Sequence, residues 1–158
     1  MRLVKPLSIA AVLATCLIVA SSSDAGLYRR QYYSGWSYYP SSSYYYSYYY
    51  YKPYDSYDGY SYHYCIYYPA QPRYVYYYNP YSRVYWGRFD TQGKEGEQYS
   101  LLAEKDRKRT LKDIPDKAFP KPGKMPEIPD AKDGERIAAP AKEDLPKGEP
   151  KDLPSDKP

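Results

Sequence analysis

The sequence predicts a mostly disordered, exported chain with one small all-β element, a two- or three-stranded antiparallel meander at residues 73–102. Purely apolar residues are scarce: Leu, Ile, Val and Phe make up roughly a tenth of residues 26–158, and less than ~20% indicates disorder. The 26 tyrosines lie mostly upstream of the meander, and most of the 16 prolines lie downstream among charged residues. Only residues 73–102 combine aromatic and β-branched runs with turn signals.

Residues 1–25 have the composition of a secretory signal peptide. Arg2 and Lys5 precede an apolar run at residues 7–20, and small residues follow up to Ala25. This order of basic, apolar and small residues is typical of a cleaved signal, and the run is too short to span a bilayer comfortably. We expect cleavage after Ala25, with Ala20 as the alternative. The mature protein would then be extracellular, periplasmic or on the cell surface, with no stable membrane span.

Residues 26–72 form a low-complexity tract rich in Tyr and Ser. The spacings of two and three between tyrosines interleave without a lasting period of 2 or 3.6, so the tract is predicted to be disordered or weakly β-prone. Such a polar and aromatic composition is compatible with self-association, because tyrosine combines an apolar ring with a hydroxyl. The tract is therefore either an adhesive or assembling segment, whose rings stack on each other or on sugars or are cross-linked by oxidation, or an exposed spacer.

The tract contains the few residues with distinctive side-chain chemistry. Asp55, Asp58, His63 and Cys65 are of the types that ligate metals, but their spacing matches no metal motif, so no metal or other cofactor is predicted. Because Cys16 lies in the signal, Cys65 is unpaired in an exported chain, which indicates an intermolecular disulfide or a free thiol. A single histidine without an orienting partner provides no acid–base constellation, so we expect no enzymatic activity.

The predicted meander begins with a hairpin. Residues 74–78 and 83–89 are strand-forming runs, and Asn79-Pro80-Tyr81-Ser82 between them suits a type I turn. An isolated hairpin is marginal in water, so a third strand at residues 98–102 would complete the sheet.

A four-residue turn at residues 79–82 determines the register and faces of this hairpin. Tyr78 would pair with Arg83, and the pairing would continue as Tyr77 with Val84, Tyr76 with Tyr85 and Val75 with Trp86. The predicted core face comprises Val75, Tyr77, Val84 and Trp86. The opposite face would be exposed and able to bind a ligand; it comprises Tyr74, Tyr76, Tyr78, Arg83 and Tyr85.

The remaining residues are charged and proline-rich. Residues 103–114 are compatible with a short helix that Pro115 would end, and residues 114–130 have polyproline II composition with four apolar residues, namely Ile114, Phe119, Met125 and Ile128. Residues 103–130 either dock on the predicted core face and complete the module or form a free linker. Residues 131–158 are expected to be a disordered tail.

Several blocks, spanning about residues 76–147, resemble blocks that recur in a group of uncharacterised bacterial secreted proteins. They are YYYNPYSRVYWGRFD, YSLLAEKDRK, IPDKAFPKPGKMPEIPD and EDLPK. The resemblance implies secretion but provides no activity, cofactor or catalytic residue. Residues 76–79 with Trp86 are also similar to the second half of a WW domain, which would imply a Pro-rich ligand, although Trp36 is too distant to be that domain's first Trp.

These observations favour a non-enzymatic exported envelope or surface protein that acts in assembly or adhesion through tyrosine stacking. The alternative is a small aromatic-faced binding module for a glycan or a Pro-rich peptide. Nucleic acid is not expected as a partner, because the formal net charge of +4 includes two cations of the signal and the mature charge is slight.

Overall fold

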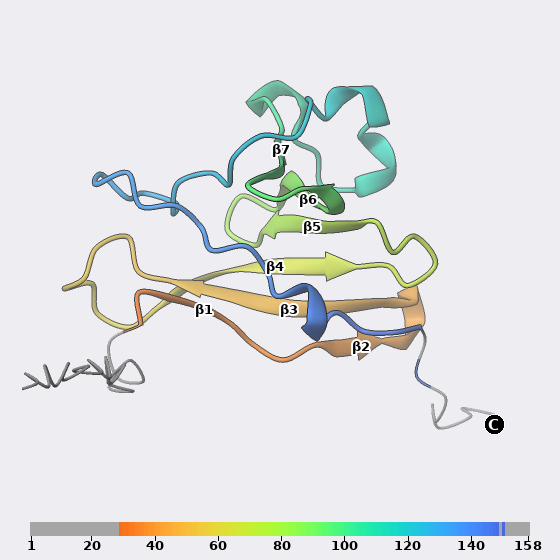
Figure 1. Cartoon of the computed structure of the whole chain (residues 1–158), viewed down its shortest axis with the longest axis horizontal. Helices are drawn as coiled ribbons and strands as arrows, with labels where there is room; N and C mark the ends of the chain where they lie inside the picture. The colour runs from red at the N-terminus through yellow and green to blue at the C-terminus, as the bar shows by residue number, and fades with distance from the viewer. Residues whose placement is uncertain (1–28, 149, 151–158) are drawn as a thin grey trace, which may run out of the picture.

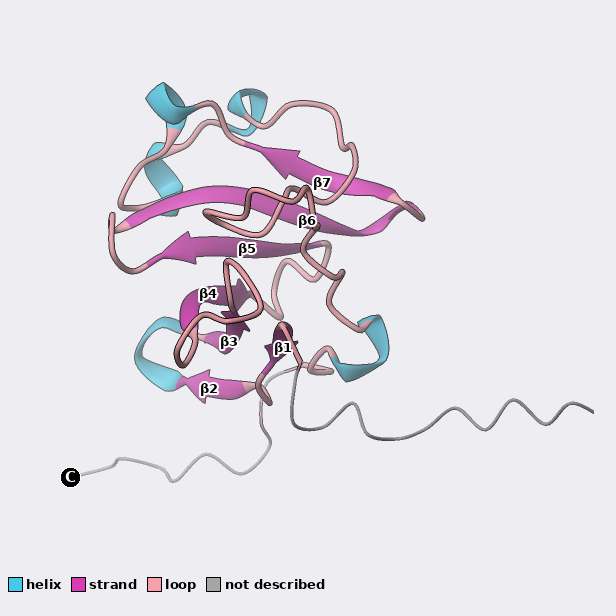
Figure 2. Ribbon diagram, turned by 90° about the vertical axis from the view of Figure 1, so that its left-hand side faces the viewer, coloured by secondary structure: helices cyan, strands magenta, loops and turns pink. Residues whose placement is uncertain are grey.

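The structure, a computed structural model, describes residues 29–148 and residue 150. Within them the chain forms one curled, seven-stranded antiparallel sheet (Figures 1 and 2). The strands are β1 (Gln31–Tyr33), β2 (Ser37–Tyr39), β3 (Tyr44–Tyr51), β4 (Ser61–Tyr67), β5 (Tyr74–Asn79), β6 (Val84–Lys94) and β7 (Glu97–Leu101). The prediction of a mostly disordered chain with two or three strands is therefore wrong. The predicted signal peptide and residues 151–158 of the predicted tail lie outside the described residues.

Strands β3 to β7 form a meander in which each pairs with the next. At one edge, β1 and β2 both pair with β3, in the registers Tyr33 with Tyr49 and Ser37 with Tyr46. They act as one edge strand that is interrupted between them. Ser34 bridges the interruption, since its backbone amide donates to the Tyr48 carbonyl at 2.8 Å and its hydroxyl accepts from the Tyr48 amide at 2.9 Å.

The tyrosine tract forms most of the first four strands, in contrast to its predicted disorder. On β3 the odd-numbered residues point to the inner face and the even-numbered ones to the outer face, so tyrosines occupy both sides. A buried tyrosine contributes its large ring to packing, provided that its hydroxyl finds a partner. The Tyr33 and Tyr77 hydroxyls lie 2.7 Å apart, and the Tyr49 hydroxyl donates to Gln31 at 2.9 Å. The count of Leu, Ile, Val and Phe underestimated the core because it left tyrosine out.

The predicted β5–β6 hairpin exists, but its register differs. Asn79 remains in the ladder opposite Val84 while its side chain accepts hydrogen bonds from the Tyr81 and Ser82 amides at 2.8 and 3.2 Å. The loop is therefore residues 80–83, and Arg83 takes a left-handed conformation with φ of 58°.

A β-bulge then changes the pairing along the same hairpin. Tyr78 faces Tyr85, but Tyr77 faces Gly87, so Trp86 is the extra residue. A bulge lets two successive residues lie on one side of a strand. The predicted pairs of Tyr77 with Val84 and Val75 with Trp86 are replaced, yet the Trp86 ring still packs on the inner face.

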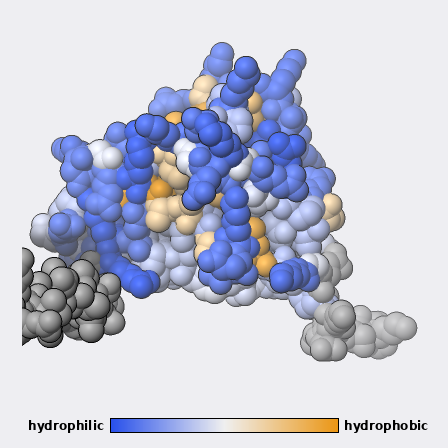
Figure 3. Space-filling view, in the orientation of Figure 1, coloured by the Kyte–Doolittle hydropathy of each residue, from blue (hydrophilic) through white to orange (hydrophobic). Residues whose placement is uncertain are grey.

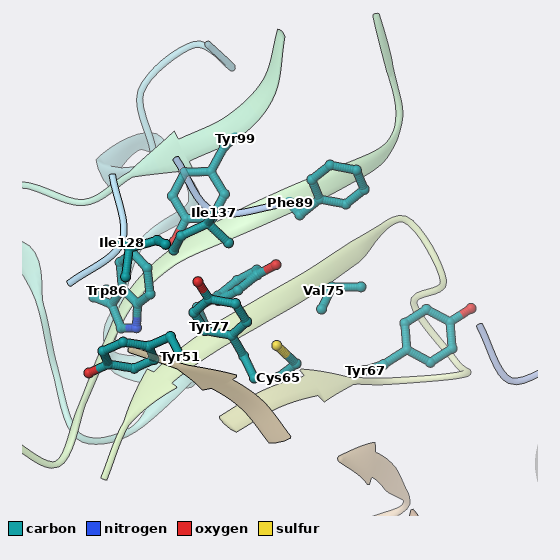
Figure 4. Packing of buried hydrophobic residues seen from close by; sticks show 11 residues of the cluster. Tyr51, Cys65, Tyr67, Val75, Tyr77, Trp86, Phe89, Tyr99, Ile128 and Ile137 are labelled. Atoms are coloured by element: carbon teal, nitrogen blue, oxygen red, sulfur yellow. The ribbon is translucent and has the colours of Figure 1, made fainter. Parts of the chain in front are cut away.

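Two hydrophobic clusters lie on opposite faces of the sheet. The inner cluster, most of which is shown in Figure 4, comprises Tyr49, Tyr51, Cys65, Tyr67, Val75, Tyr77, Trp86, Phe89, Tyr99, Ile128 and Ile137. The outer cluster comprises Ile66, Tyr76, Tyr85, Leu102, Ile114 and Phe119. Each cluster combines residues of the sheet with residues that follow β7.

The chain after β7 wraps around the sheet edge and covers both faces. It contains short 3-10 turns, not the predicted helix, at Glu104–Asp106, Leu111–Asp113, Asp116–Ala118 and Lys142–Asp144. Its first part places Ile114 and Phe119 in the outer cluster. The chain crosses the edge of β7 where Tyr99 and Gly123 exchange hydrogen bonds of 2.9 and 2.8 Å, and Ile128 and Ile137 then join the inner cluster. Figure 3 shows the face crossed by this second part as mostly hydrophilic, with smaller hydrophobic areas.

The predicted disordered tail is thus packed as far as residue 148. Its ordering is supported by polar contacts with the first strand, because Arg30 pairs with Asp133 and, at 2.7 Å, with Glu135. The Gln31 side chain donates to the Arg136 carbonyl at 2.9 Å. No helix in the described part of the chain has the length and hydropathy to cross a membrane.

Candidate functional site

Tyrosine rings pave the outer face of the sheet over β3 and β4. Because successive side chains of a strand alternate between faces, the even-numbered residues of both strands point outward. The half-buried rings are Tyr44, Tyr46, Tyr48, Tyr50, Tyr62 and Tyr64. The cover formed by residues 102–119 packs on Tyr76 and Tyr85 farther along the sheet and leaves this tyrosine face open.

Tyr48 lies at the centre of the tyrosine face. Its ring centroid is 5.6 Å from that of Tyr50 in a stacked arrangement and 5.0 Å and 5.4 Å from those of Tyr64 and Tyr62. Tyr32 of β1 extends the surface, since it stacks on Tyr50 at 4.9 Å. Rings that support each other in this way form a continuous and preorganised aromatic surface.

A groove of about 470 Å³ lies on the tyrosine face beside the cover. Tyr46, Tyr48 and Tyr64 line it, together with the buried side chains of Ile66 and Tyr85. Arg109, from the cover, is the one charged side chain among its described lining residues. A cavity of this size with mainly aromatic walls and a few polar groups is typical of a ligand site.

Two buried or half-buried tyrosines of the groove, Tyr64 and Tyr85, have altered acidity. Burial, and secondarily hydrogen bonding to Tyr48, raises the pKa of Tyr64 above its ordinary value, and burial raises the pKa of Tyr85 in the same direction. Both phenols therefore remain protonated at neutral pH and can donate and accept hydrogen bonds. The groove offers apolar ring surfaces edged by hydroxyls, an arrangement that suits ligand binding.

The residues of the predicted exposed face do not form one surface. Tyr76 is 6% exposed and Tyr85 7% exposed, because the cover packs on them. The Arg88 guanidinium lies 3.9 Å from the ring centroid of Tyr74, and Arg83 is exposed in the hairpin loop. Only Tyr85 and Tyr78 of the predicted face border the groove.

The residues of the predicted core face lie largely together. Val75, Tyr77 and Trp86 are buried in the inner cluster, whereas Val84 is only half-buried, at the end of the hairpin. Tyr77 packs edge-to-face on Trp86, with ring centroids 5.4 Å apart. The bulge explains how Trp86 reaches this face despite the changed register.

The residues considered for metal binding are separated. His63 and Cys65 are buried on the inner face of β4, while Asp55 and Asp58 are exposed in the loop between β3 and β4. Within the described residues, no three or more His, Cys, Asp or Glu side chains come together in a way that could hold a metal ion.

Cys65 has no exposed surface in this fold, so the proposed intermolecular disulfide would require the sheet to open. Burial also raises the pKa of its thiol above the ordinary value, and a protonated, buried thiol is inert. We expect a Cys16→Ser variant, in which Cys65 is the sole cysteine, to react fully with a thiol reagent in denaturant but hardly at all when folded. Rapid reaction of the folded protein, or a disulfide-linked dimer on a non-reducing gel, would contradict this placement.

Sequence reasoning missed the groove because most of its tyrosines lie in the low-complexity tract. The signal that could have revealed it is a series of large side chains at even-numbered positions. They are Tyr44, Tyr46, Tyr48 and Tyr50, and then Tyr62, Tyr64 and Ile66. Tyrosines at intervening odd positions, such as Tyr45 and Tyr49, concealed this period of two. Comparison with protein-family models, with curated proteins and with solved structures finds no match for this chain.

Proposed function

We propose that this protein is a non-enzymatic adhesion protein, exported to the cell envelope or surface, whose tyrosine groove binds glycan chains. The observation that carries the proposal is the open groove of mutually supported tyrosine rings, with Arg109 at its border. Export is supported by the composition of residues 1–25.

A glycan suits this groove on chemical grounds. A pyranose ring has an apolar C–H face and a polar edge of hydroxyls, so it matches rings that carry their own hydroxyls. Tyr48 and Tyr64 would stack on sugar faces, while hydroxyls along the groove would exchange hydrogen bonds with the sugar edge. The rings are already packed together, so little conformational entropy is lost on binding.

Assembly through the sheet edges is a weaker explanation of adhesion. The first edge consists of two three-residue strands, β1 and β2, and short edge strands resist pairing with another chain. At the other edge, Tyr99 of β7 already pairs with Gly123, which follows the cover in the chain. The tyrosine face therefore remains the better candidate for contact with a partner.

The test is an isothermal titration calorimetry experiment in which the full chain is titrated with soluble oligosaccharides, for example cellohexaose and chitohexaose. We expect saturable binding that weakens about tenfold in each of Tyr48→Ala and Tyr64→Ala, because one lost aromatic contact is worth ~1 kcal/mol or slightly more. Tyr54→Ala is the matched control, since Tyr54 is 55% exposed and does not line the groove.

Two outcomes would overturn the proposal. One is the absence of saturable binding to any oligosaccharide. The other is an equal loss in Tyr48→Ala and in the Tyr54→Ala control. Concentration-dependent assembly without sugar, abolished by Tyr48→Ala, would instead favour self-association of the tyrosine face.

A further inference from the structure

A second cavity lies on the inner face of the sheet, apart from the tyrosine groove. It has a volume of about 550 Å³ and lies between the end of the β5–β6 hairpin and residues 126–131, which follow the cover in the chain. His63 of β4 and Trp86 of β6 both line it. None of its lining residues belongs to the groove.

Two residues of the cavity wall carry buried nitrogens that lack a partner. His63 is 3% exposed and Trp86 7% exposed, yet His63 Nδ1 and Trp86 Nε1 make no hydrogen bond within the described residues. The two ring centroids are only 5.3 Å apart. Buried polar groups are nearly always hydrogen-bonded, and those without a partner require an explanation.

The chemistry of the two nitrogens defines the missing group. An indole N–H can only donate. The Tyr51 hydroxyl lies 3.4 Å from His63 Nε2, and Figure 4 shows the indole nitrogen of Trp86 on the side of its ring toward Tyr51. When Tyr51 donates to Nε2, the proton of the neutral imidazole is on Nδ1, which then donates as well. Two such donors on neighbouring residues of one cavity can be satisfied together by a single oxygen with two lone pairs, such as a carbonyl oxygen.

The charges around the cavity favour an uncharged ligand. Arg107 and Arg136 are balanced by Glu127 and Asp130, and burial keeps His63 neutral by lowering its pKa to about 4. A charged ligand at the buried end would therefore lose hydration without a dedicated counter-ion.

The arginines and the carboxylates of this group differ in whether their side chains already form hydrogen bonds. Arg107 Nε already donates to the Leu102 carbonyl at 3.2 Å, and Arg136 Nη1 donates to the Met125 carbonyl at 2.6 Å. The side chains of Glu127 and Asp130 take part in no hydrogen bond or ion pair within the described residues. Their carboxylates can therefore accept an N–H from a ligand.

We propose that this cavity binds the secondary amide group of a small uncharged molecule. Trp86 Nε1 and His63 Nδ1 donate to the amide carbonyl, and a carboxylate of Glu127 or Asp130 accepts the amide N–H. The apolar side chains of Val84, Leu101 and Ile128, which also line the cavity, contact the substituents of the amide. The shared chemistry is that of an acetamido sugar or of a peptide unit.

The experiment is an NMR titration of the full chain. His63 is the sole histidine of the sequence, and a Trp36→Phe variant leaves Trp86 as the sole tryptophan. In this variant the imidazole ¹⁵N signals and the indole N–H signal report on the cavity alone. The probes are N-acetylglucosamine, with glucose as the matched sugar without an amide, and N-acetylglycine N-methylamide as the peptide arm.

We expect at least one acetamido probe to shift both signals saturably, while glucose shifts neither. A shift by the sugar alone, or by the peptide alone, supports the proposal and identifies the source of the amide. Trp86→Phe keeps a ring but removes the donor and should weaken binding about tenfold. Tyr48→Ala should leave binding here unchanged, which separates this cavity from the groove.

The proposal is overturned if neither amide probe gives a saturable shift. That result is expected of a cavity that holds only water. The proposal is also overturned if glucose shifts both signals as much as N-acetylglucosamine does. The titrations of the Trp36→Phe chain do not depend on whether Trp86→Phe folds.

Discussion

Replacing Gly87 by alanine is expected to destabilise the fold by about 3 kcal/mol or more, at the upper end of the usual range for overpacking. A Cβ at this position would lie 2.5 Å from Tyr99 Cζ and 2.6 Å from Cε1, and closer still to the Tyr99 hydroxyl. The Tyr99 ring cannot easily move away, because it is 2% exposed and packs against Tyr77 and Trp86. Thermal unfolding should show a melting temperature roughly 10 °C lower or more.

Two further variants make this test specific. Gly35→Ala is the control, because a Cβ at Gly35 meets nothing within 4 Å, and it should change stability little. In a Tyr99→Leu background the added effect of Gly87→Ala should be clearly smaller, since the clashing ring is gone. If Gly87→Ala melted like the wild type, the close approach of Tyr99 to β6 would be incorrect.

The stability of the fold is expected to fall by roughly 3 kcal/mol as the pH is lowered from 6.5 to 4, because of His63. Burial lowers the pKa of this side chain from 6.5 to about 4. Between these values the unfolded chain binds a proton that the folded chain does not, so stability rises with pH at up to ~1.4 kcal/mol per unit. The stability that depends on a neutral His63 is fully present above pH 6.5 and is lost as the pH falls toward 4.

Urea unfolding of the wild type at pH 7, 5.5 and 4.5 measures this dependence, and His63→Gln is the matched control because glutamine does not titrate. Carboxylates such as Asp133, whose pKa the Arg30 hydrogen bond lowers to about 2, contribute mainly below this range. The His63→Gln variant should be less stable than the wild type at pH 7, but its free energy of unfolding should change little between pH 7 and pH 4.5. A wild type and variant with parallel pH profiles would show that His63 is not buried as a neutral ring.

Part of the sheet was predictable from the sequence. The aromatic and β-branched runs around Asn79 correctly indicated β5 and β6, since strand formers flanked a recognisable turn. The register was not predictable to the residue, because Asn79 serves both as a ladder residue and as the acceptor for the turn amides. The bulge at Trp86 depends on how its ring fits against Tyr77 and Tyr99, which no local pattern specifies.

The tyrosine tract and its groove were not predictable by the same reasoning. A strand exposed on one face alternates apolar and polar residues, but β3 has tyrosine on both faces, and the alternation is lost. The proline-rich segment raised a different difficulty. Its apolar residues indicated docking, yet Phe119 and Ile128 pack on opposite faces, and the crossing depends on the contact between Gly123 and β7.

The contacts between Arg30 and Gln31, at the start of the sheet, and residues 135–136 affect when folding can finish. Arg30 and Gln31 bind Glu135 and Arg136, which follow them by more than a hundred residues. A ribosome makes the chain from its N-terminus, so β1 must wait for these partners until almost the whole sequence has been synthesised. During that interval the inner face lacks Ile128 and Ile137. We therefore expect the inner cluster to close only after residue 137 has been synthesised.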